Sequence, residues 1–344
     1  MERDRLEKRL CCLMSLKHFV LTGYARNGLY LLIKALGWDH NTEIITPAFT
    51  CSIIPKTIEK AGVRPIPIDS EEAGLNIDPQ KLEKAITMNT KAIYVIHTYG
   101  TAARIDEICA IANEHNLIVI EDLAHSLFSY YKGKQLGTYG DFALLSFTKK
   151  IINFEGGAIG TNNTTIYENM LSIQNSYTKY RFFTFNDIVN NITRIIGSIW
   201  ESKFYSIALV LMKMMDISDK VFYNGQYGLD VDSRKFFMHE IAKRITLMQL
   251  DSLFIRNKDR KKNSDYVDFI RKFSKVMKFP DLNQNSNDTL PLYNVGIIKK
   301  NPLNSFFSFR TWFNNYEFGR YPRADYLYSN LRIFANMFYY IKRG

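Results

Sequence analysis

The sequence predicts an α/β protein whose mostly parallel sheet is flanked by helices, with a small α+β region at its C-terminal end. Short apolar segments alternate with segments of helical periodicity through the first half of the 344 residues. The short segments are mostly apolar, as is typical of parallel strands buried on both faces. Three polar residues, His97, Asp122 and Ser146, fall where predicted strands end. Because parallel sheets bind ligands beyond the carboxyl ends of their strands, we expect a site there.

The predicted elements of the first half follow one another in a regular order. Strands are expected at residues 43–45, 65–69, 91–97, 117–121 and 141–145, and helices at 27–36, 52–61, 79–85 and 105–115. Pro47 ends the first of these strands, and Pro79 begins the third helix. The order predicts repeated strand–helix–strand units, which build a parallel sheet covered on both faces.

The second half has a different pattern. Residues 182–227 are rich in aromatic residues and methionine, have helical spacing and contain no proline, which predicts a helical insertion. A long helix is expected to begin near Asp232-Ser233 and to reach Arg260, and a strand is expected at 290–298. We therefore expect a large domain over residues 1–230 and a small domain over 231–344.

Composition limits the class of protein. A formal net charge of +11 can steer anionic ligands, but it is equally typical of a solvated basic surface, and nothing in the pattern predicts a nucleic-acid partner. The four cysteines lack a CxxC spacing, so we expect no disulfide framework and a reduced, cytoplasmic setting. The longest apolar segment, 204–212, is too short to span a bilayer, and it leaves peripheral membrane contact without support. No metal-ligand spacing stands out.

A lysine and an aspartate stand out at the predicted strand ends. Asp122 follows the apolar strand 117–121, and Lys149 lies shortly after the strand 141–145 and before Glu155-Gly-Gly157. An enzyme that uses pyridoxal 5'-phosphate (PLP) needs such a pair, because the lysine forms the Schiff base and the acid keeps the pyridine nitrogen protonated. The segment 23–29 begins a helix whose N–H groups can bind the phosphate, with Arg26 and Ser146 beside it.

Four motifs in order extend this pattern. They are residues 43–51, residues 91–100, residues 120–125 with 131–137, and Ser146, Lys149 and Glu155-Gly-Gly157. In this order and spacing the chain resembles the DegT/DnrJ/EryC1/StrS family of sugar aminotransferases, which are PLP enzymes of fold type I. The resemblance covers about residues 23 to 162 and is fainter around residues 245–250.

The resemblance implies a role for each matching residue. Lys149 is the Schiff-base lysine and moves the proton, and Asp122 pairs with the pyridine nitrogen. His125 matches the residue that contacts the ring hydroxyl. The remaining matches are the phosphate binders Ser146, Arg26 and Asn27, and the segment beside the ring, Thr50 and Cys51. The resemblance also implies a homodimer with shared sites.

The chain departs from the family pattern at three places. Lys149 follows Ser146 by three residues, where many members have five, although its six-residue distance to Glu155 is kept. The kept distance favours Lys149 over Lys150, which stays an alternative. Cys51 stands where many members carry an aromatic residue, and the segment 182–227 replaces the region that brings an asparagine across the dimer interface.

Three functions follow from these observations. The first is an aminotransferase that moves an amino group from glutamate to a keto sugar, expected to be nucleotide-linked, in surface polysaccharide, lipopolysaccharide or antibiotic sugar biosynthesis. The second is a dehydratase of the same family, which Lys149 argues against because such enzymes usually replace this lysine. The third is a non-catalytic partner in polysaccharide assembly. A nucleotide-binding Rossmann enzyme is disfavoured, because no GxGxxG follows a predicted strand.

Purely structural roles stay open for several residues. Asp122 can cap a turn, and His97 and His125 can be buried structural histidines. Gly156-Gly157 is expected to form a hairpin turn beside the cofactor.

Overall fold

The computed structural model describes residues 4–72, 74–151, 153–177 and 236–258, together with five short stretches. These stretches are residues 277–278, 294–298, 314–315, 322–323 and 331–334. The insertion predicted for residues 182–227 and the helix start predicted at Asp232-Ser233 lie outside the described residues.

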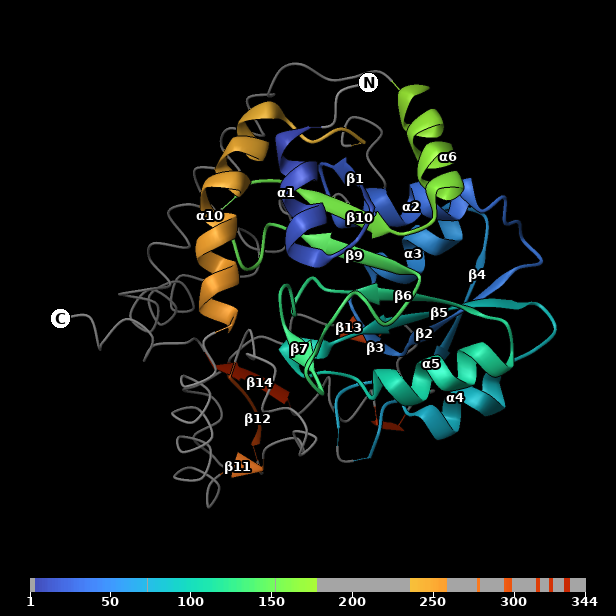
Figure 1. Ribbon diagram of the computed structural model, residues 1–344. Helices are drawn as coiled ribbons and strands as arrows, with labels where there is room; N and C mark the ends of the chain where they lie inside the picture. Colours follow the sequence, from blue (N-terminus) through green and yellow to red (C-terminus); the bar gives the residue numbers. More distant parts are fainter. Residues whose placement is uncertain are drawn as a thin grey trace, which may run out of the picture.

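A seven-stranded sheet forms the centre of the described structure, in the order β4-β2-β5-β6-β9-β10-β1 (Figure 1). Its strands are β1 (His18–Thr22), β2 (Glu43–Pro47), β4 (Arg64–Ile68), β5 (Thr90–Ile96), β6 (Ile118–Asp122), β9 (Phe142–Ser146) and β10 (Gly157–Thr161). Neighbours pair in parallel from β4 to β9, whereas β10 runs antiparallel to both β9 and β1. The predicted mostly parallel sheet is confirmed.

Helices cover the sheet on both faces. They are α1 (Arg5–Met14), α2 (Ala25–Ala35), α3 (Ile53–Lys60), α4 (Pro79–Ala85), α5 (Ile105–Glu114), α6 (Thr164–Asn175), α10 (Glu240–Lys258) and the short 3-10 helix η1 (Thr98–Gly100). Small strand groups complete the described structure: β7 (Tyr130–Tyr131) with β8 (Lys134–Gln135), β3 (Phe49–Thr50) with β13 (Asn314–Asn315), and β12 (Asn294–Ile298) between β11 (Met277–Lys278) and β14 (Leu331–Phe334).

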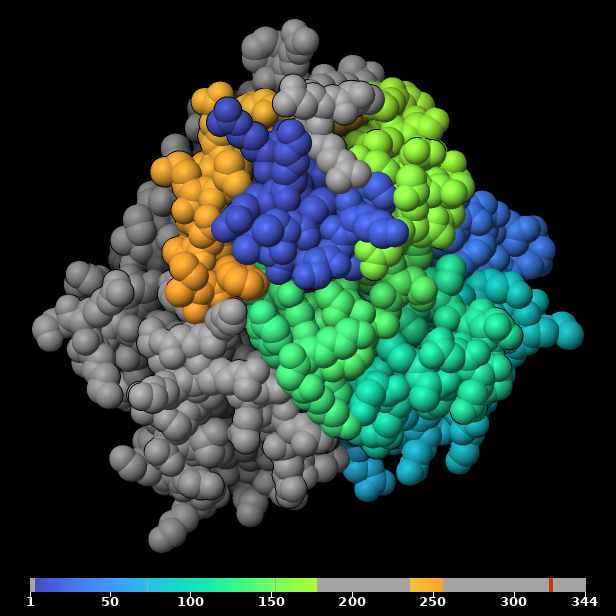
Figure 2. All heavy atoms as spheres, viewed as in Figure 1, coloured from blue at the N-terminus to red at the C-terminus, as the bar shows by residue number. Residues whose placement is uncertain are grey.

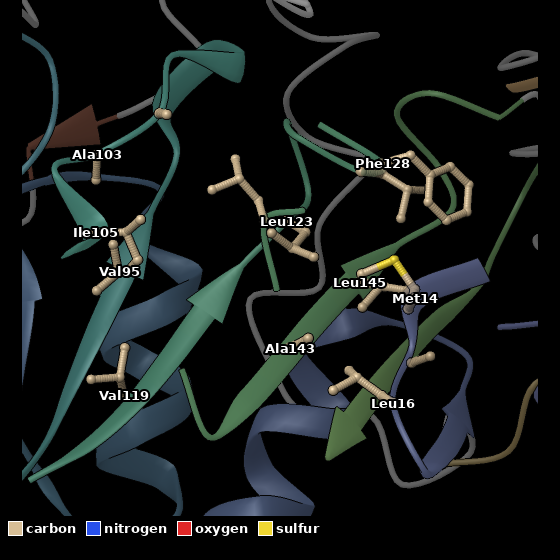
Figure 3. Close-up of a cluster of buried hydrophobic side chains, with 14 of the residues drawn as sticks. Met14, Leu16, Val95, Ala103, Ile105, Val119, Leu123, Phe128, Ala143 and Leu145 are labelled. Carbon is tan, nitrogen blue, oxygen red and sulfur yellow. The ribbon is translucent and has the colours of Figure 1, made fainter. Parts of the chain in front are cut away.

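Two apolar clusters, one on each face of the sheet, explain the continuous apolar strands. On β5, Val95 packs in one cluster and its neighbours Tyr94 and Ile96 pack in the other. The first cluster includes side chains of α1, α4, α5 and α10, and the second includes side chains of α2, α3 and α6. Figure 3 shows part of the first cluster, where Met14 lies beside Leu145. Successive residues of the inner strands therefore face opposite cores. The exposed positions Lys91 of β5 and Arg64 of β4 lie near the starts of their strands.

The N-terminal helix α1 lies beside α10 (Figures 1 and 2). Arg9 Nε contacts Asp251 Oδ1 at 2.7 Å, and Lys243 Nζ contacts Asp4 Oδ2 at 2.9 Å. Helix α10 thus packs against the large domain, although its residues lie beyond the domain boundary predicted near residue 230. That boundary stays a prediction. Among the described residues, no helix is both long and apolar enough to cross a membrane.

The link between β9 and β10 differs from the simple hairpin turn predicted at Gly156-Gly157. β9 ends at Ser146 and β10 begins at Gly157, and Lys149 lies in the connection between them. Gly156 has a φ of +135°, a conformation that only glycine adopts readily, and its N–H donates to the Gly23 carbonyl at 2.6 Å. The two glycines therefore join the loop to the start of α2.

Candidate active site

The predicted site residues lie at the carboxyl ends of neighbouring parallel strands. Asp122 is the last residue of β6, and Ser146 is the last residue of β9. The strands pair with Asp122 opposite Leu144, two residues before Ser146. Lys149 and His125 lie in the loops that follow these strands, and their side chains meet. This is the edge of the sheet where the sequence predicted a ligand site.

Asp122 is a buried carboxylate with both oxygens engaged. Its Oδ2 accepts a hydrogen bond from the Tyr94 hydroxyl at 2.6 Å, and its Oδ1 accepts one from Ala124 N at 2.8 Å. Burial and the neighbouring Asp122 charge raise the pKa of Tyr94 well above its usual value, so this hydroxyl stays a donor. The hydrogen bond from Ala124 N shows that Asp122 caps the following turn with Oδ1, the structural role considered for it. Its Oδ2 is bound separately by Tyr94 and has no part in that turn. Tyr94 is a site residue that the sequence reasoning missed.

Lys149 lies against His125. The distance between Lys149 Nζ and His125 Nε2 is 2.9 Å. Burial lowers the pKa of Lys149, while the neighbouring Asp122 and Cys51 side chains oppose that shift. Burial and the two neighbouring lysines, Lys149 and Lys150, hold the pKa of His125 well below its usual value. The site therefore contains a neutral imidazole beside a lysine that loses its proton more easily than an exposed one.

Tyr99 is a second residue that the sequence reasoning missed. Its backbone N–H donates to His125 Nδ1 at 3.1 Å, and its ring stacks on the imidazole with centroids 5.3 Å apart. Tyr99 lies in η1, directly after β5, and has a φ of +54°. The signal that could have revealed it is its position in the motif 91–100, at the end of a strand next to β6.

Lys150 has different surroundings from Lys149. Burial lowers its pKa to about 7, and no neighbouring charge contributes to this shift. Asp122, in contrast, acts on Lys149. Only Lys149 of the two therefore lies in contact with His125 and within electrostatic reach of the buried carboxylate.

The start of α2 comes very close to the sheet beside Ser146. Gly157 pairs with Ser146 on one side and with Thr22 on the other. A Cβ at Gly157 would lie 2.3 Å from Ala25 N, so only glycine allows this approach. The residue before α2, Tyr24, makes no side-chain hydrogen bond to the helix. The first N–H groups of α2 therefore lie at the same end of the sheet as Ser146, where the start of a helix favours an anion.

The two predicted phosphate binders of α2 lie in its first turn. The Arg26 guanidinium lies 4.3 Å from the centre of the Tyr24 ring. Asn27 is buried, and its backbone N–H donates to the Tyr24 carbonyl at 3.0 Å. Both residues therefore lie at the start of α2, and the Arg26 charge lies over the aromatic face of Tyr24.

The predicted segment beside the ring, Thr50 and Cys51, borders the same site. Cys51 is partly buried and acts electrostatically on both Lys149 and Tyr94. The buried Thr50 Oγ1 has no hydrogen-bond partner among the described residues. Thr50 pairs through its backbone with Asn314 of β13, so the C-terminal part of the chain reaches this wall of the site.

His97 does not join the site, in agreement with the structural role considered for it. Its Nε2 lies 3.3 Å from Oε2 of the buried Glu121, and its Nδ1 accepts from Ala103 N at 3.1 Å. Glu121 precedes Asp122 on β6, so the two side chains point to opposite faces. His97 therefore helps to hold the far side of the strand rather than the ligand site.

This donor set fits pyridoxal phosphate. An oriented carboxylate suits a pyridinium nitrogen, an amine of lowered pKa suits an aldehyde, and an uncapped helix start beside a serine suits a phosphate. The sheet order, with one antiparallel strand between β9 and β1, together with this donor set is that of fold type I, the fold of a large class of PLP-dependent proteins.

Comparisons with known proteins agree with this class. The profile of the DegT/DnrJ/EryC1/StrS aminotransferase family matches residues 1–195. The chain belongs to this family, which depends on pyridoxal phosphate.

Individual relatives are similar over part of their length. The spore coat polysaccharide biosynthesis protein SpsC of Bacillus subtilis is 37% identical over 162 residues, which are 46% of this chain and 42% of the relative. A GDP-perosamine synthase of Caulobacter vibrioides is 35% identical over 166 residues, 48% of this chain and 45% of the relative. The matched stretch thus spans less than half of each relative. The crystal structure of DesV from S. venezuelae superposes with a TM-score of 0.70 at 18% identity, covering 96% of this chain and 82% of that one, which shows the shared fold.

Proposed function

We propose that this protein is an aminotransferase that moves an amino group from glutamate to a nucleotide-linked keto sugar. The observation that carries the proposal is the position of Lys149, whose Nζ lies 2.9 Å from His125 Nε2 and within electrostatic reach of Asp122. A lysine of lowered pKa facing a fixed carboxylate at the edge of a parallel sheet is typical of catalysis rather than of packing.

Each residue has a distinct task in this proposal. Bound PLP supplies the electron sink that labilises a proton on the substrate carbon. Lys149 Nζ holds the cofactor and afterwards takes and returns that proton in both half-reactions. The Asp122 carboxylate keeps a proton on the ring nitrogen. The Tyr94 hydroxyl and the Ala124 N–H each donate to this carboxylate and fix its orientation.

The remaining site residues position the cofactor. Ser146 and the first turn of α2, with Arg26 and Asn27, would bind the phosphate, where the helix dipole favours an anion. His125 would contact the ring hydroxyl, and Thr50 and Cys51 would border the ring. The buried Thr50 hydroxyl, which has no partner among the described residues, is a candidate donor to the ligand.

The substrate class rests on the relatives and on charge. GDP-perosamine synthase, by its name, makes a nucleotide-linked amino sugar, and SpsC, by its name, acts in polysaccharide biosynthesis. The net charge of +11 suits an anionic nucleotide diphosphate. On the family resemblance we also expect a homodimer in the cytoplasm, acting in surface polysaccharide, lipopolysaccharide or antibiotic sugar biosynthesis.

Two alternatives stay in view. A dehydratase of the same family is disfavoured, because such an enzyme usually replaces the lysine that is present here as Lys149. A non-catalytic partner in polysaccharide assembly is disfavoured by the contact of Lys149 with a buried histidine and its closeness to a buried carboxylate. A contact between a lysine and a buried histidine at the carboxyl ends of parallel strands is more typical of a functional site than of packing.

A spectroscopic experiment tests the proposal. The protein mixed with PLP should give the visible absorbance band of a lysine-bound cofactor, and borohydride should fix the cofactor on the peptide that contains residue 149. Lys149→Ala should abolish the band, while the matched change Lys150→Ala should keep it. Glutamate should bleach the band, and the right nucleotide-linked keto sugar should restore it. A band that survives Lys149→Ala would refute the assignment.

A further inference from the structure

We propose that the main chain at Tyr99 fixes His125 as a hydrogen-bond donor at Nε2, and that this donor holds Lys149 as a neutral amine before the cofactor binds. The inference rests on the proposed function only for the identity of the cofactor. It concerns three residues of this chain, and it makes Tyr99 and His125 positioning residues for Lys149.

The first step is the tautomer of His125. A backbone N–H can only donate, so the 3.1 Å contact from Tyr99 N requires a lone pair on His125 Nδ1. An imidazole with a lone pair at Nδ1 is not the imidazolium, and its single proton lies on Nε2. The main chain therefore selects one of the two neutral tautomers.

The second step is the protonation of Lys149. His125 Nε2 lies 2.9 Å from Lys149 Nζ, and in the selected tautomer this nitrogen donates. An ammonium group has three donors and no acceptor, whereas a neutral amine has a lone pair. The contact is therefore a hydrogen bond only if Lys149 is neutral, and a neutral amine is the form that attacks an aldehyde.

The third step is the rigidity of the histidine. Its ring stacks on Tyr99 with an interplanar angle of 14°. The Phe49 ring packs edge-on against the Tyr99 ring, with the two ring centroids 6.5 Å apart. Tyr99 is fully buried, and its left-handed backbone costs free energy that the surrounding packing must offset. This backbone turns the N–H towards His125, so the ring cannot rotate without losing both the stack and the hydrogen bond.

Other titratable groups lie near Lys149 and His125 and shift the pKa of each. Asp122 from β6 and Cys51 from the segment after β3 favour the charged form of Lys149. Burial opposes them and lowers the pKa of Lys149, and Lys150 from the same loop acts on His125. Without the donor at Nε2, the carboxylate would hold Lys149 as an ammonium more strongly. The Tyr99–His125 contact therefore counterbalances Asp122.

The test measures the lysine itself, without the cofactor. Competitive labelling of the full-length, cofactor-free chain with acetic anhydride as a function of pH, read by mass spectrometry, gives the titration midpoint of Lys149. His125→Phe keeps an aromatic ring on Tyr99 but removes the donor, so the midpoint should rise by about one pH unit, about tenfold less neutral amine near pH 7. His125→Gln, whose amide can accept from Tyr99 N and donate to Lys149, should largely restore it. The exposed His115→Gln is the matched control and should change nothing.

Nitrogen NMR on the unmodified chain tests the tautomer directly. With ¹⁵N-labelled histidine, the His125 signals, identified by their loss in His125→Gln, should show a protonated Nε2 and an unprotonated Nδ1. The opposite tautomer, or an unchanged Lys149 midpoint in His125→Phe, would overturn the inference. If the wild-type chain binds no PLP while both results hold, the proposed function fails and this inference stands.

Discussion

The Tyr94 hydroxyl donates to Asp122 Oδ2 at 2.6 Å from the neighbouring parallel strand. In the register of β5 and β6, Tyr94 lies beside Ile120, two residues before Asp122 and on the same face. The parallel sheet thus aims a buried hydroxyl at the carboxylate that the proposed mechanism needs in its charged form.

Loss of this hydroxyl should weaken cofactor binding without unfolding the protein. Tyr94→Phe keeps the ring in its apolar cluster but removes one hydrogen bond to a charged group, which contributes about 1.5–3 kcal/mol. We expect PLP affinity, measured by absorbance titration, to fall roughly tenfold or more. Tyr139→Phe removes a hydroxyl that donates to the Tyr131 carbonyl instead, and should leave the affinity unchanged. Equal effects of the two changes would contradict a role for Tyr94 in the site.

Glu121 should be a stability residue rather than a functional one. Its buried carboxylate accepts from three backbone N–H groups, those of Gly137, Tyr139 and Gly140, and lies against His97. Glu121→Gln replaces one acceptor oxygen by a donor, which leaves buried N–H groups without a partner. We expect the free energy of unfolding in urea to fall by about 2–4 kcal/mol. The exposed Glu114→Gln should change it by less than about 0.5 kcal/mol, and a loss of that small size at Glu121 would refute this role.

The five parallel strands could be predicted from sequence because four of them, all except the edge strand β4, are largely buried on both faces. That burial leaves short, continuous apolar runs such as Ile118–Asp122 and Phe142–Ser146, whose ends also carry Asp122 and Ser146. The site could therefore be located before its geometry was known. Tyr94 could not be assigned to it, because its partner depends on the register of two strands that are distant in sequence.

Other elements escaped the sequence reasoning for physical reasons. β10 contains Gly157 and Gly160, and glycine is unusual inside strands. Both positions require it here, since a Cβ at Gly160 would lie 2.4 Å from the Phe19 ring and one at Gly157 would meet α2. α1 was overlooked because its charges dominate the segment, yet Leu6, Leu10 and Leu13 have the spacing of one helical face.

Gly157→Ala should separate the start of α2 from the sheet and thereby weaken phosphate binding. The new methyl group would lie 2.3 Å from Ala25 N, a backbone atom that can yield only if the helix moves. We expect weaker PLP binding together with a lower free energy of unfolding, of the order of 1–3 kcal/mol for overpacking. Gly28→Ala is the control, since its nearest contact would be a Leu144 side-chain atom at 3.3 Å. If Gly157→Ala binds inorganic phosphate and PLP as the unmodified chain does, the start of α2 is not the phosphate site.

Lys150 should make the stability of the protein depend on pH above neutrality. Its pKa is lowered from 10.5 to about 7, so the unfolded chain binds more protons than the folded chain between these two values. Stability therefore rises with pH through this window, by at most about 1.4 kcal/mol per pH unit from this group. Lys150→Met removes the burial of an amine and should raise stability at pH 7, while the gain between pH 7 and pH 10 becomes smaller. Urea unfolding at both pH values, with the exposed Lys60→Met as the matched control, measures the difference, and an unchanged pH dependence would show that Lys150 is charged and solvated in the folded protein.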